Sequence, residues 1–156
     1  MSDFLSVLRS TFSPMSIWHP WRHLADNHPE IIVSTRHELP GTMMGYRRGN
    51  RIWLCRTLNQ AERRSTLTHE LQHLWRGPVP RESHHATMRE EQIVSALAAR
   101  QLIPLAKLVD ALRWTRDEYE LADELWVDAP TVRCRIQCLD PIETAELEHH
   151  LNGEWL

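Results

Sequence analysis

The stretch that decides the fold reads Thr66-Leu67-Thr68-His69-Glu70-Leu71-Gln72-His73-Leu74-Trp75. It holds an H-E-x-x-H pattern inside a segment whose spacing of apolar residues predicts a helix. Residues four apart lie on one face of a helix, so His69 and His73 can direct two imidazoles at one Zn²⁺ ion. Glu70 lies beside them, where a carboxylate can take a proton from water. The pattern predicts a zinc site, and the alternative is a polar helix that carries this spacing by chance.

Short β-branched segments before this helix predict a small sheet. Residues 31–35 are rich in isoleucine, valine and threonine, which favour strands. Residues 43–47 and 51–55 flank the compact turn at residues 48–50, an arrangement typical of a β-hairpin. We therefore expect a three-stranded, antiparallel-type sheet packed on the helix that carries His69.

The rest of the chain is predicted to be mostly helical. The helix of the H-E-x-x-H pattern should begin at Asn59, with Glu62 completing a capping box, and should end before Gly77. Further helices are expected at residues 17–27, 86–102, 104–114, 116–126, 128–139 and 140–152. The predicted class is α+β. We expect an N-terminal arm (1–16), a zincin-like core (17–114) and a C-terminal helical subdomain packed on that core (115–156).

Bulk composition is that of an ordinary globular domain. The chain has 156 residues, of which 42% are hydrophobic and 25% are charged. It contains no apolar run of transmembrane length and no signal-peptide pattern, so we expect no contact with a membrane. Its three cysteines, Cys55, Cys134 and Cys138, cannot all pair in disulfides, which favours a reduced, cytoplasmic protein.

A hydrolytic zinc site needs a third protein ligand, and the best source is the pair Glu90 and Glu91 in the following predicted helix. Glu91 is favoured because Ser95, four residues later, can orient a histidine ligand from behind. Glu90 has apolar neighbours at helical spacing, so it also leans toward the core. The alternative is that both glutamates are solvated on an exposed face.

The tetrahedral oxyanion formed during peptide hydrolysis requires a hydrogen-bond donor in addition to the metal. His84 and His85 fall in the predicted loop between the two ligand helices, and they are candidates for this role or for substrate contact. Loop histidines are more often solvated, which is the alternative for both.

The charge is divided unevenly along the chain. Residues 1–116 carry 16 Lys and Arg against 10 Asp and Glu, whereas residues 117–156 carry 2 against 11. Residues 121–136 resemble a DNA-binding helix-turn-helix, with Arg133 and Arg135 on the recognition helix. Trp126 at the turn and the surrounding acidic residues oppose this interpretation. Direct binding of nucleic acid is thus disfavoured, and the acidic surface suits packing on the core or docking of a basic protein.

Three stretches of the chain match one known pattern. They are T-L-T-H-E-L-Q-H-L-W (66–75), R-E-E-Q-I-V-S-A-L-A-A-R-Q-L-I-P (89–104) and R-I-W-L (51–54). With them the chain resembles the ImmA/IrrE family of short zinc-dependent metallopeptidases over roughly residues 15–140. H-E-x-x-H is shared by many metallopeptidases. The A-A-R-Q-L-I-P ending at this distance makes the resemblance specific.

The resemblance implies His69, His73 and Glu91 as zinc ligands and Glu70 as the catalytic base. The family often has Asn or Asp where this chain has Ser95, which implies weaker support of a histidine ligand. Members often cleave a helix-turn-helix repressor and thereby release genes of prophages, mobile elements or stress responses. We therefore expect a zinc endopeptidase of narrow specificity. The alternatives are a non-catalytic, metal-stabilised protein-binding module and a DNA-binding regulator; the sequence indicates no oligomeric state.

Overall fold

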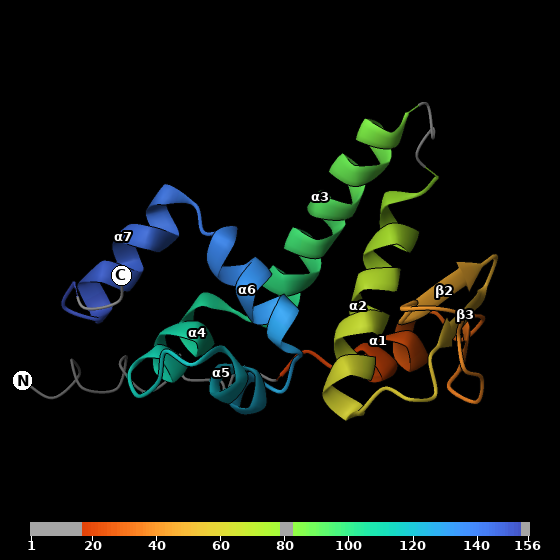
Figure 1. Cartoon of the computed structure of the whole chain (residues 1–156), viewed down its shortest axis with the longest axis horizontal. Helices are drawn as coiled ribbons and strands as arrows, with labels where there is room; N and C mark the ends of the chain where they lie inside the picture. Colours follow the sequence, from red (N-terminus) through yellow and green to blue (C-terminus); the bar gives the residue numbers. More distant parts are fainter. Residues whose placement is uncertain (1–16, 79–82, 154–156) are drawn as a thin grey trace, which may run out of the picture.

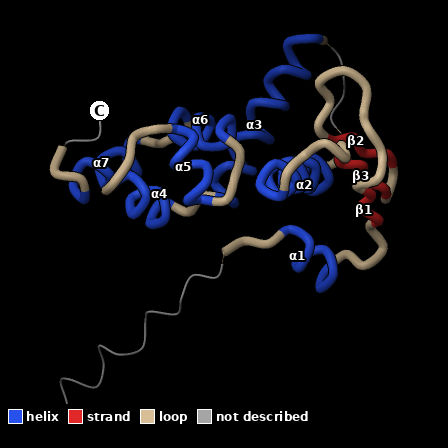
Figure 2. Tube along the Cα trace, turned by 60° about the horizontal axis from the view of Figure 1, so that its bottom comes forward, coloured by secondary structure: helices blue, strands red, loops and turns tan. Residues whose placement is uncertain are grey.

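The computed structural model describes residues 17–78 and 83–153, and the predicted N-terminal arm lies outside them. Figures 1 and 2 show the α+β class that the sequence predicts, with helix α2 between a small sheet and a helical half. The elements are α1 (Pro20–Asn27), β1 (Ile32–Ser34), β2 (Gly45–Arg48), β3 (Arg51–Leu54), α2 (Gln60–Arg76), α3 (His84–Leu102), α4 (Leu105–Leu112), α5 (Glu118–Leu125), α6 (Ala129–Gln137) and α7 (Pro141–His150).

The sheet has three strands in the order β1-β3-β2 and is mixed rather than antiparallel throughout. β2 and β3 form the predicted hairpin, with Gly49 at a φ of 61° in its turn. β1 pairs with β3 in parallel, Ile32 opposite Arg51. The chain leaves β1, passes through a loop and builds β2 before it returns as β3. The β1–β3 connection is thus long enough for a parallel pair, which a tight turn cannot join.

Helix α2 begins and ends where its local sequence predicts. The Asn59 side chain accepts from the Glu62 backbone N–H, and the Glu62 carboxylate accepts from the Asn59 N–H, which completes the capping box. Gly77 follows at a φ of 77°, in the region that favours glycine. Leu67 and Leu71 are fully buried against the sheet, and their burial fixes which face of α2 remains for the cleft.

Helix α3 returns alongside α2 (Figure 1) and begins earlier than expected. Ser83 caps it by accepting a hydrogen bond from the Ala86 N–H at 3.1 Å. His84 and His85 therefore occupy the first turn of a helix and not a loop, which corrects the sequence prediction.

The helical half has its own core and is tied to α2. Leu108, Leu121 and Leu147 are among the buried residues that α4, α5 and α7 bring together. Arg64 of α2 is fully buried and donates to backbone carbonyls, including that of Trp126 at 2.7 Å. Burial lowers the pKa of Arg64 to about 10. This guanidinium links the start of α2 to the end of α5.

Among the described residues, no single helix combines the length and apolarity needed to cross a membrane. Helices α3 and α4 meet those criteria of length and composition only as a pair, and they are bent by 73° relative to each other.

Candidate active site

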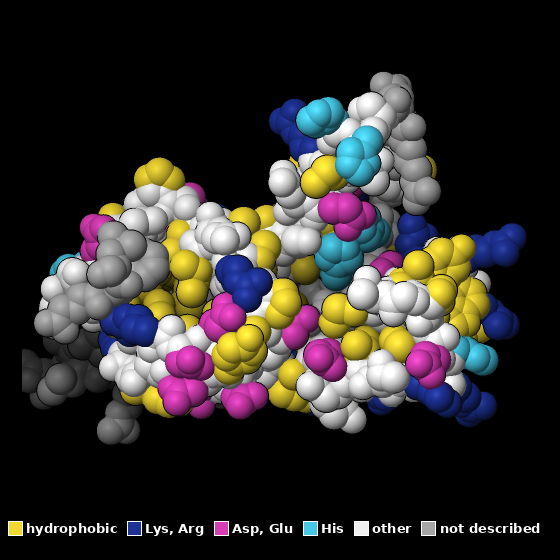
Figure 3. All heavy atoms as spheres, in the orientation of Figure 1, with side chains coloured by type: hydrophobic (Ala, Val, Ile, Leu, Met, Phe, Trp, Pro, Cys, Tyr) yellow, Lys and Arg dark blue, Asp and Glu magenta, His cyan; other side chains and the backbone are white. Residues whose placement is uncertain are grey.

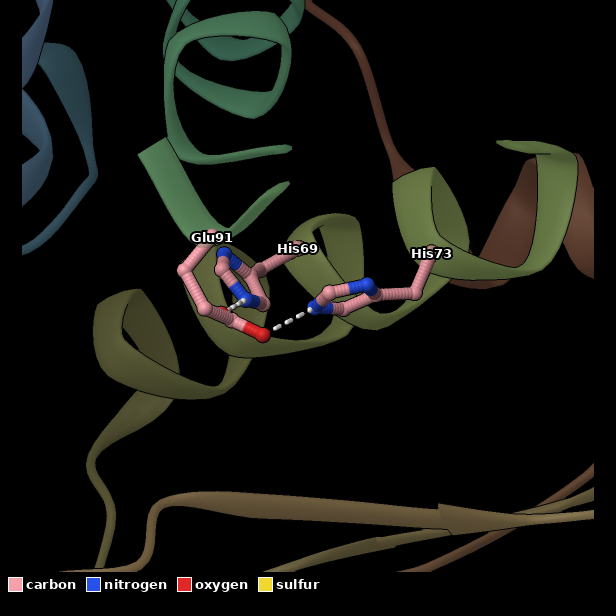
Figure 4. A group of neighbouring side chains, drawn as sticks. All are labelled: His69, His73 and Glu91. Carbon is pink, nitrogen blue, oxygen red and sulfur yellow. Dashed lines mark hydrogen bonds and ion pairs between the residues drawn. The ribbon is translucent and has the colours of Figure 1, made fainter. Parts of the chain in front are cut away.

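Three side chains from two helices converge beside the sheet (Figure 4). His69 and His73 project from one face of α2, with ring centroids 4.9 Å apart. Glu91 of α3 reaches both: one carboxylate oxygen lies 3.2 Å from His69 Nε2 and the other lies 3.2 Å from His73 Nε2. All three candidate ligand atoms lie within 4.8 Å of one another, so the group could hold a metal ion.

The two consecutive glutamates of α3 have different partners. Glu91 faces the histidines, whereas Glu90 is buried and forms a bidentate ion pair with Arg76, at 2.5 and 2.8 Å. Side-chain direction changes by about 100° between neighbouring helical residues, so at any one rotation of α3 the two carboxylates point to different partners. In this structure only Glu91 lies where it can complete a group of three ligands.

The chemistry of the donor set fits zinc. Two imidazole nitrogens and one carboxylate oxygen leave a fourth tetrahedral position open, as in hydrolytic zinc sites. Burial, and then the neighbouring His73, lower the pKa of His69, although Glu91 acts in the opposite direction. A lowered pKa favours the neutral imidazole, which is the form that binds a metal.

Glu70 lies next to the candidate ligands and lines the cleft described below. Burial raises the pKa of its carboxyl, while the nearby charges of His73 and Arg47 lower it in part. Gly45 at the start of β2 passes close to it. A Cβ on Gly45 would lie 2.9 Å from Glu70 Oε1 and 2.6 Å from Thr66 Cγ2. The missing side chain therefore leaves the space in which the Glu70 carboxylate sits.

The group opens into a cleft of about 640 Å³. Its walls come from β2 and the residues before it on one side and from the first turns of α6 on the other, and α2 and α3 form its floor. Figure 3 shows histidine and acidic side chains gathered at the hollow between the upper helices and the sheet. The size of the cleft is that of a small-ligand or peptide-binding site.

Of the remaining residues predicted for the site, one lines the cleft and two do not. Ser95 lines it, but within the described part of the chain its hydroxyl makes no hydrogen bond to either histidine. His84 and His85 are exposed at the far end of α3 and do not line the cleft. Arg47 lines the cleft, and among the described residues it is the only Lys or Arg that does so.

Sequence reasoning missed Gly45 and Arg47 as members of the site. They are two apart on β2 and hence share the face of the sheet that covers α2, a signal present in strand alternation once the register is known. It also missed the α6 wall, including Asp128 and Thr131, because nothing local in the sequence brings α6 back to α2.

Both arginines of helix α6 have acidic partners within the protein. Arg133 is held by Glu118 of α5 at 2.9 Å. Arg135 is buried and donates to the Ile103 carbonyl and to Glu143. Arg135 is thus engaged inside the protein, whereas Arg133 is exposed and paired with an acidic side chain. Base readout needs arginines free to enter a groove.

An H-E-x-x-H helix on a small sheet, joined by a carboxylate from the next helix, has the organisation of a zincin-type metallopeptidase. The chain belongs to the peptidase M78 family, because the family's IrrE N-terminal-like domain matches residues 11–136. Membership indicates a metallopeptidase-type function, a metal cofactor and a protein substrate. Neither the curated proteins nor the solved structures gave a match.

Proposed function

We propose that the protein is a zinc-dependent endopeptidase in which His69, His73 and Glu91 hold the ion and Glu70 is the general base. The observation that carries this proposal is the position of Glu91, whose two oxygens lie 3.2 Å from the Nε2 atoms of both histidines. A carboxylate that meets two imidazoles in this way supplies the third ligand of a site with an open fourth position.

Bound there, the zinc ion would lower the pKa of water and polarise the scissile carbonyl. Glu70 accepts the proton of the attacking water and then delivers it to the leaving amine. Its burial suits the first step, because burial raises the pKa of the Glu70 carboxyl and a higher pKa makes the carboxylate a stronger base. Arg47 lines the same cleft and can donate to a substrate oxygen, the role that the sequence had suggested for His84 and His85.

An extended substrate has one strand beside the metal helix on which to lie. β3 is the central strand of the sheet, so of the two hairpin strands only β2 lies at an edge of the described sheet. Residues of β2 line the cleft next to Glu70. Addition of a peptide strand to β2 would align its backbone by main-chain hydrogen bonds and bring one carbonyl to the ligands.

We further propose a helix-turn-helix repressor as substrate, which would make the enzyme a regulator of genes and place cleavage in the cytoplasm. The family resemblance supports this choice. The acidic balance of residues 117–156 supports it too, since opposite charge attracts a basic DNA-binding protein.

Co-expression with repressors encoded nearby tests the proposal. Wild type should cleave one of them, and Glu70→Gln should keep bound zinc but lose cleavage. His69→Ala should lose the zinc, measured by metal analysis of the purified protein. Cleavage that survives Glu70→Gln would overturn the mechanism. A wild-type protein that binds zinc but cleaves no repressor would favour a metal-stabilised binding module that acts without hydrolysis.

A further inference from the structure

One stripe of side chains on α2 extends past the two histidines to Arg76. His69, His73 and Arg76 are spaced by four and then three residues, so they share the face of α2 that meets α3. Glu90 and Glu91 of α3 come to this stripe from the opposite side. The stripe therefore offers two kinds of partner, a guanidinium and a pair of imidazoles, to two consecutive carboxylates.

Arg76 fixes the orientation of Glu90. Its Nε donates to one carboxylate oxygen at 2.5 Å and its Nη2 donates to the other at 2.8 Å. A planar guanidinium that holds both oxygens sets the distance and the angle of the carboxylate, which a single point charge cannot do. The Glu90 side chain is only 11% exposed, so water competes little for these hydrogen bonds.

Glu90 is a competitor for the metal position. It precedes Glu91 directly on α3, and Arg76, which holds it, follows His73 by three residues on α2. Rotation of α3 about its axis, through a large part of the roughly 100° between neighbouring side chains, would carry Glu90 toward the histidines and Glu91 away from them. The bidentate pair opposes that rotation, because it would have to break both hydrogen bonds.

We propose that Arg76 is a positioning residue that selects Glu91 over Glu90 as the third metal ligand, by binding Glu90 and setting the rotation of α3 against α2. The inference rests on the proposed function in that it takes the two histidines and a carboxylate to be the metal site. Arg76 itself touches neither metal nor substrate in this scheme.

Zinc affinity, measured by competition with a chromophoric chelator, tests the role of Arg76. Arg76→Gln should weaken binding about 10-fold, the usual effect of removing a group that supports a metal ligand. Arg76→Lys should fall between wild type and Arg76→Gln, because it keeps the charge but loses the fork. Arg113→Gln is the matched control, since it removes an exposed pair with Asp110 far from the site and should leave affinity unchanged.

Selection of Glu91 by Arg76 predicts a result that loss of packing alone does not. In the wild-type background Glu91→Gln should abolish tight binding. In the Arg76→Gln background the same change should cost much less, because the released Glu90 can take the vacant position. The d–d spectrum of the Co²⁺-substituted protein should also differ between wild type and Arg76→Gln, since it reports ligand geometry.

Unfolding of each metal-free variant shows whether a loss of affinity is only a loss of fold. Wild-type affinity in Arg76→Gln, or additive effects of the Arg76 and Glu91 substitutions, would overturn the inference while leaving the proposed function intact. If Arg76→Gln does not fold, Arg76→Lys with wild-type affinity has the same consequence. A wild-type protein that binds no zinc would instead refute the proposed function, and the inference with it.

Discussion

Gly45→Ala should damage catalysis without removing the metal. The new Cβ would lie 2.6 Å from Thr66 Cγ2 and 2.9 Å from Glu70 Oε1. Carbon atoms at rest are about 3.5–4.0 Å apart, so one side must yield by roughly 1 Å. Thr66 is β-branched and buried on a helix, hence stiff, whereas the Glu70 carboxylate is the end of a flexible side chain and will move.

The loss of stability and the loss of catalytic rate can both be estimated. Overpacking of this kind lowers the free energy of unfolding by about 1–3 kcal/mol. Glycine to alanine at an unstrained site raises it by about 0.4–1 kcal/mol, which offsets part of that loss. A displacement of about 1 Å at a catalytic group lowers the rate on the order of 100-fold. The three atoms nearest to the new Cβ belong to Thr66 and Glu70, so zinc content should stay at the wild-type value.

Urea unfolding, metal analysis and cleavage of the co-expressed repressor measure the three quantities. The double variant Gly45→Ala/Thr66→Ser separates the two clashes, because it removes Cγ2 but not the contact with Glu70. It should recover most of the stability while cleavage stays low, and Thr66→Ser alone is the control. Full cleavage by Gly45→Ala, with an unchanged unfolding midpoint, would refute the close approach of β2 to Glu70.

Three further outcomes are expected. Arg64→Met leaves buried backbone carbonyls without their donor and should lower the free energy of unfolding by about 2–4 kcal/mol in urea titrations; an unchanged midpoint would mean that the guanidinium contributes nothing net. For Glu143, burial raises the carboxyl pKa, but hydrogen bonds, led by that from Arg135, outweigh burial and lower it. Its stabilising effect is therefore present above the unfolded pKa of about 4.3 and lost as pH falls through the folded pKa, so the stability gap between wild type and Glu143→Gln should shrink from about pH 7 to about pH 3. His84→Ala/His85→Ala should keep wild-type zinc affinity and cleavage, since neither ring lines the cleft; a loss of cleavage in that variant would restore them as substrate contacts.

Local signals in the sequence predicted the parts of the fold that depend on local interactions. The capping box at Asn59 and the glycine after Arg76 placed α2 correctly, because each acts within a few residues. The parallel pairing of β1 depends on where the chain goes after it leaves the strand, which no short-range pattern records. The early start of α3 followed from Ser83, a cap signal that the prediction of a loop had overlooked.

The same distinction between local and long-range features applies to the candidate site. The spacing of His69 and His73 is a property of one helix and could be predicted from the sequence. For the third ligand, Ser95 and the family resemblance favoured Glu91 over Glu90, but helical spacing alone left the choice open, because it depends on the rotation of α3 relative to α2. The residue that marks this rotation is Arg76, which lies on a different helix and has no motif to identify it.

The helical half is part of the cleft. Arg64 and Ser65, adjacent on α2, both bind the segment between α5 and α6: Arg64 donates to the Trp126 carbonyl, and the Asp128 N–H donates to Ser65 Oγ at 3.2 Å. Trp126 has a φ of 54°, which is costly for a bulky residue and persists only where the surroundings impose it. Its ring lies 5.1 Å from the Arg64 guanidinium, which adds a cation–π contact. These contacts set the first turn of α6 opposite β2 and thus the width of the cleft, so changes at this turn should alter which peptides fit before they alter metal binding.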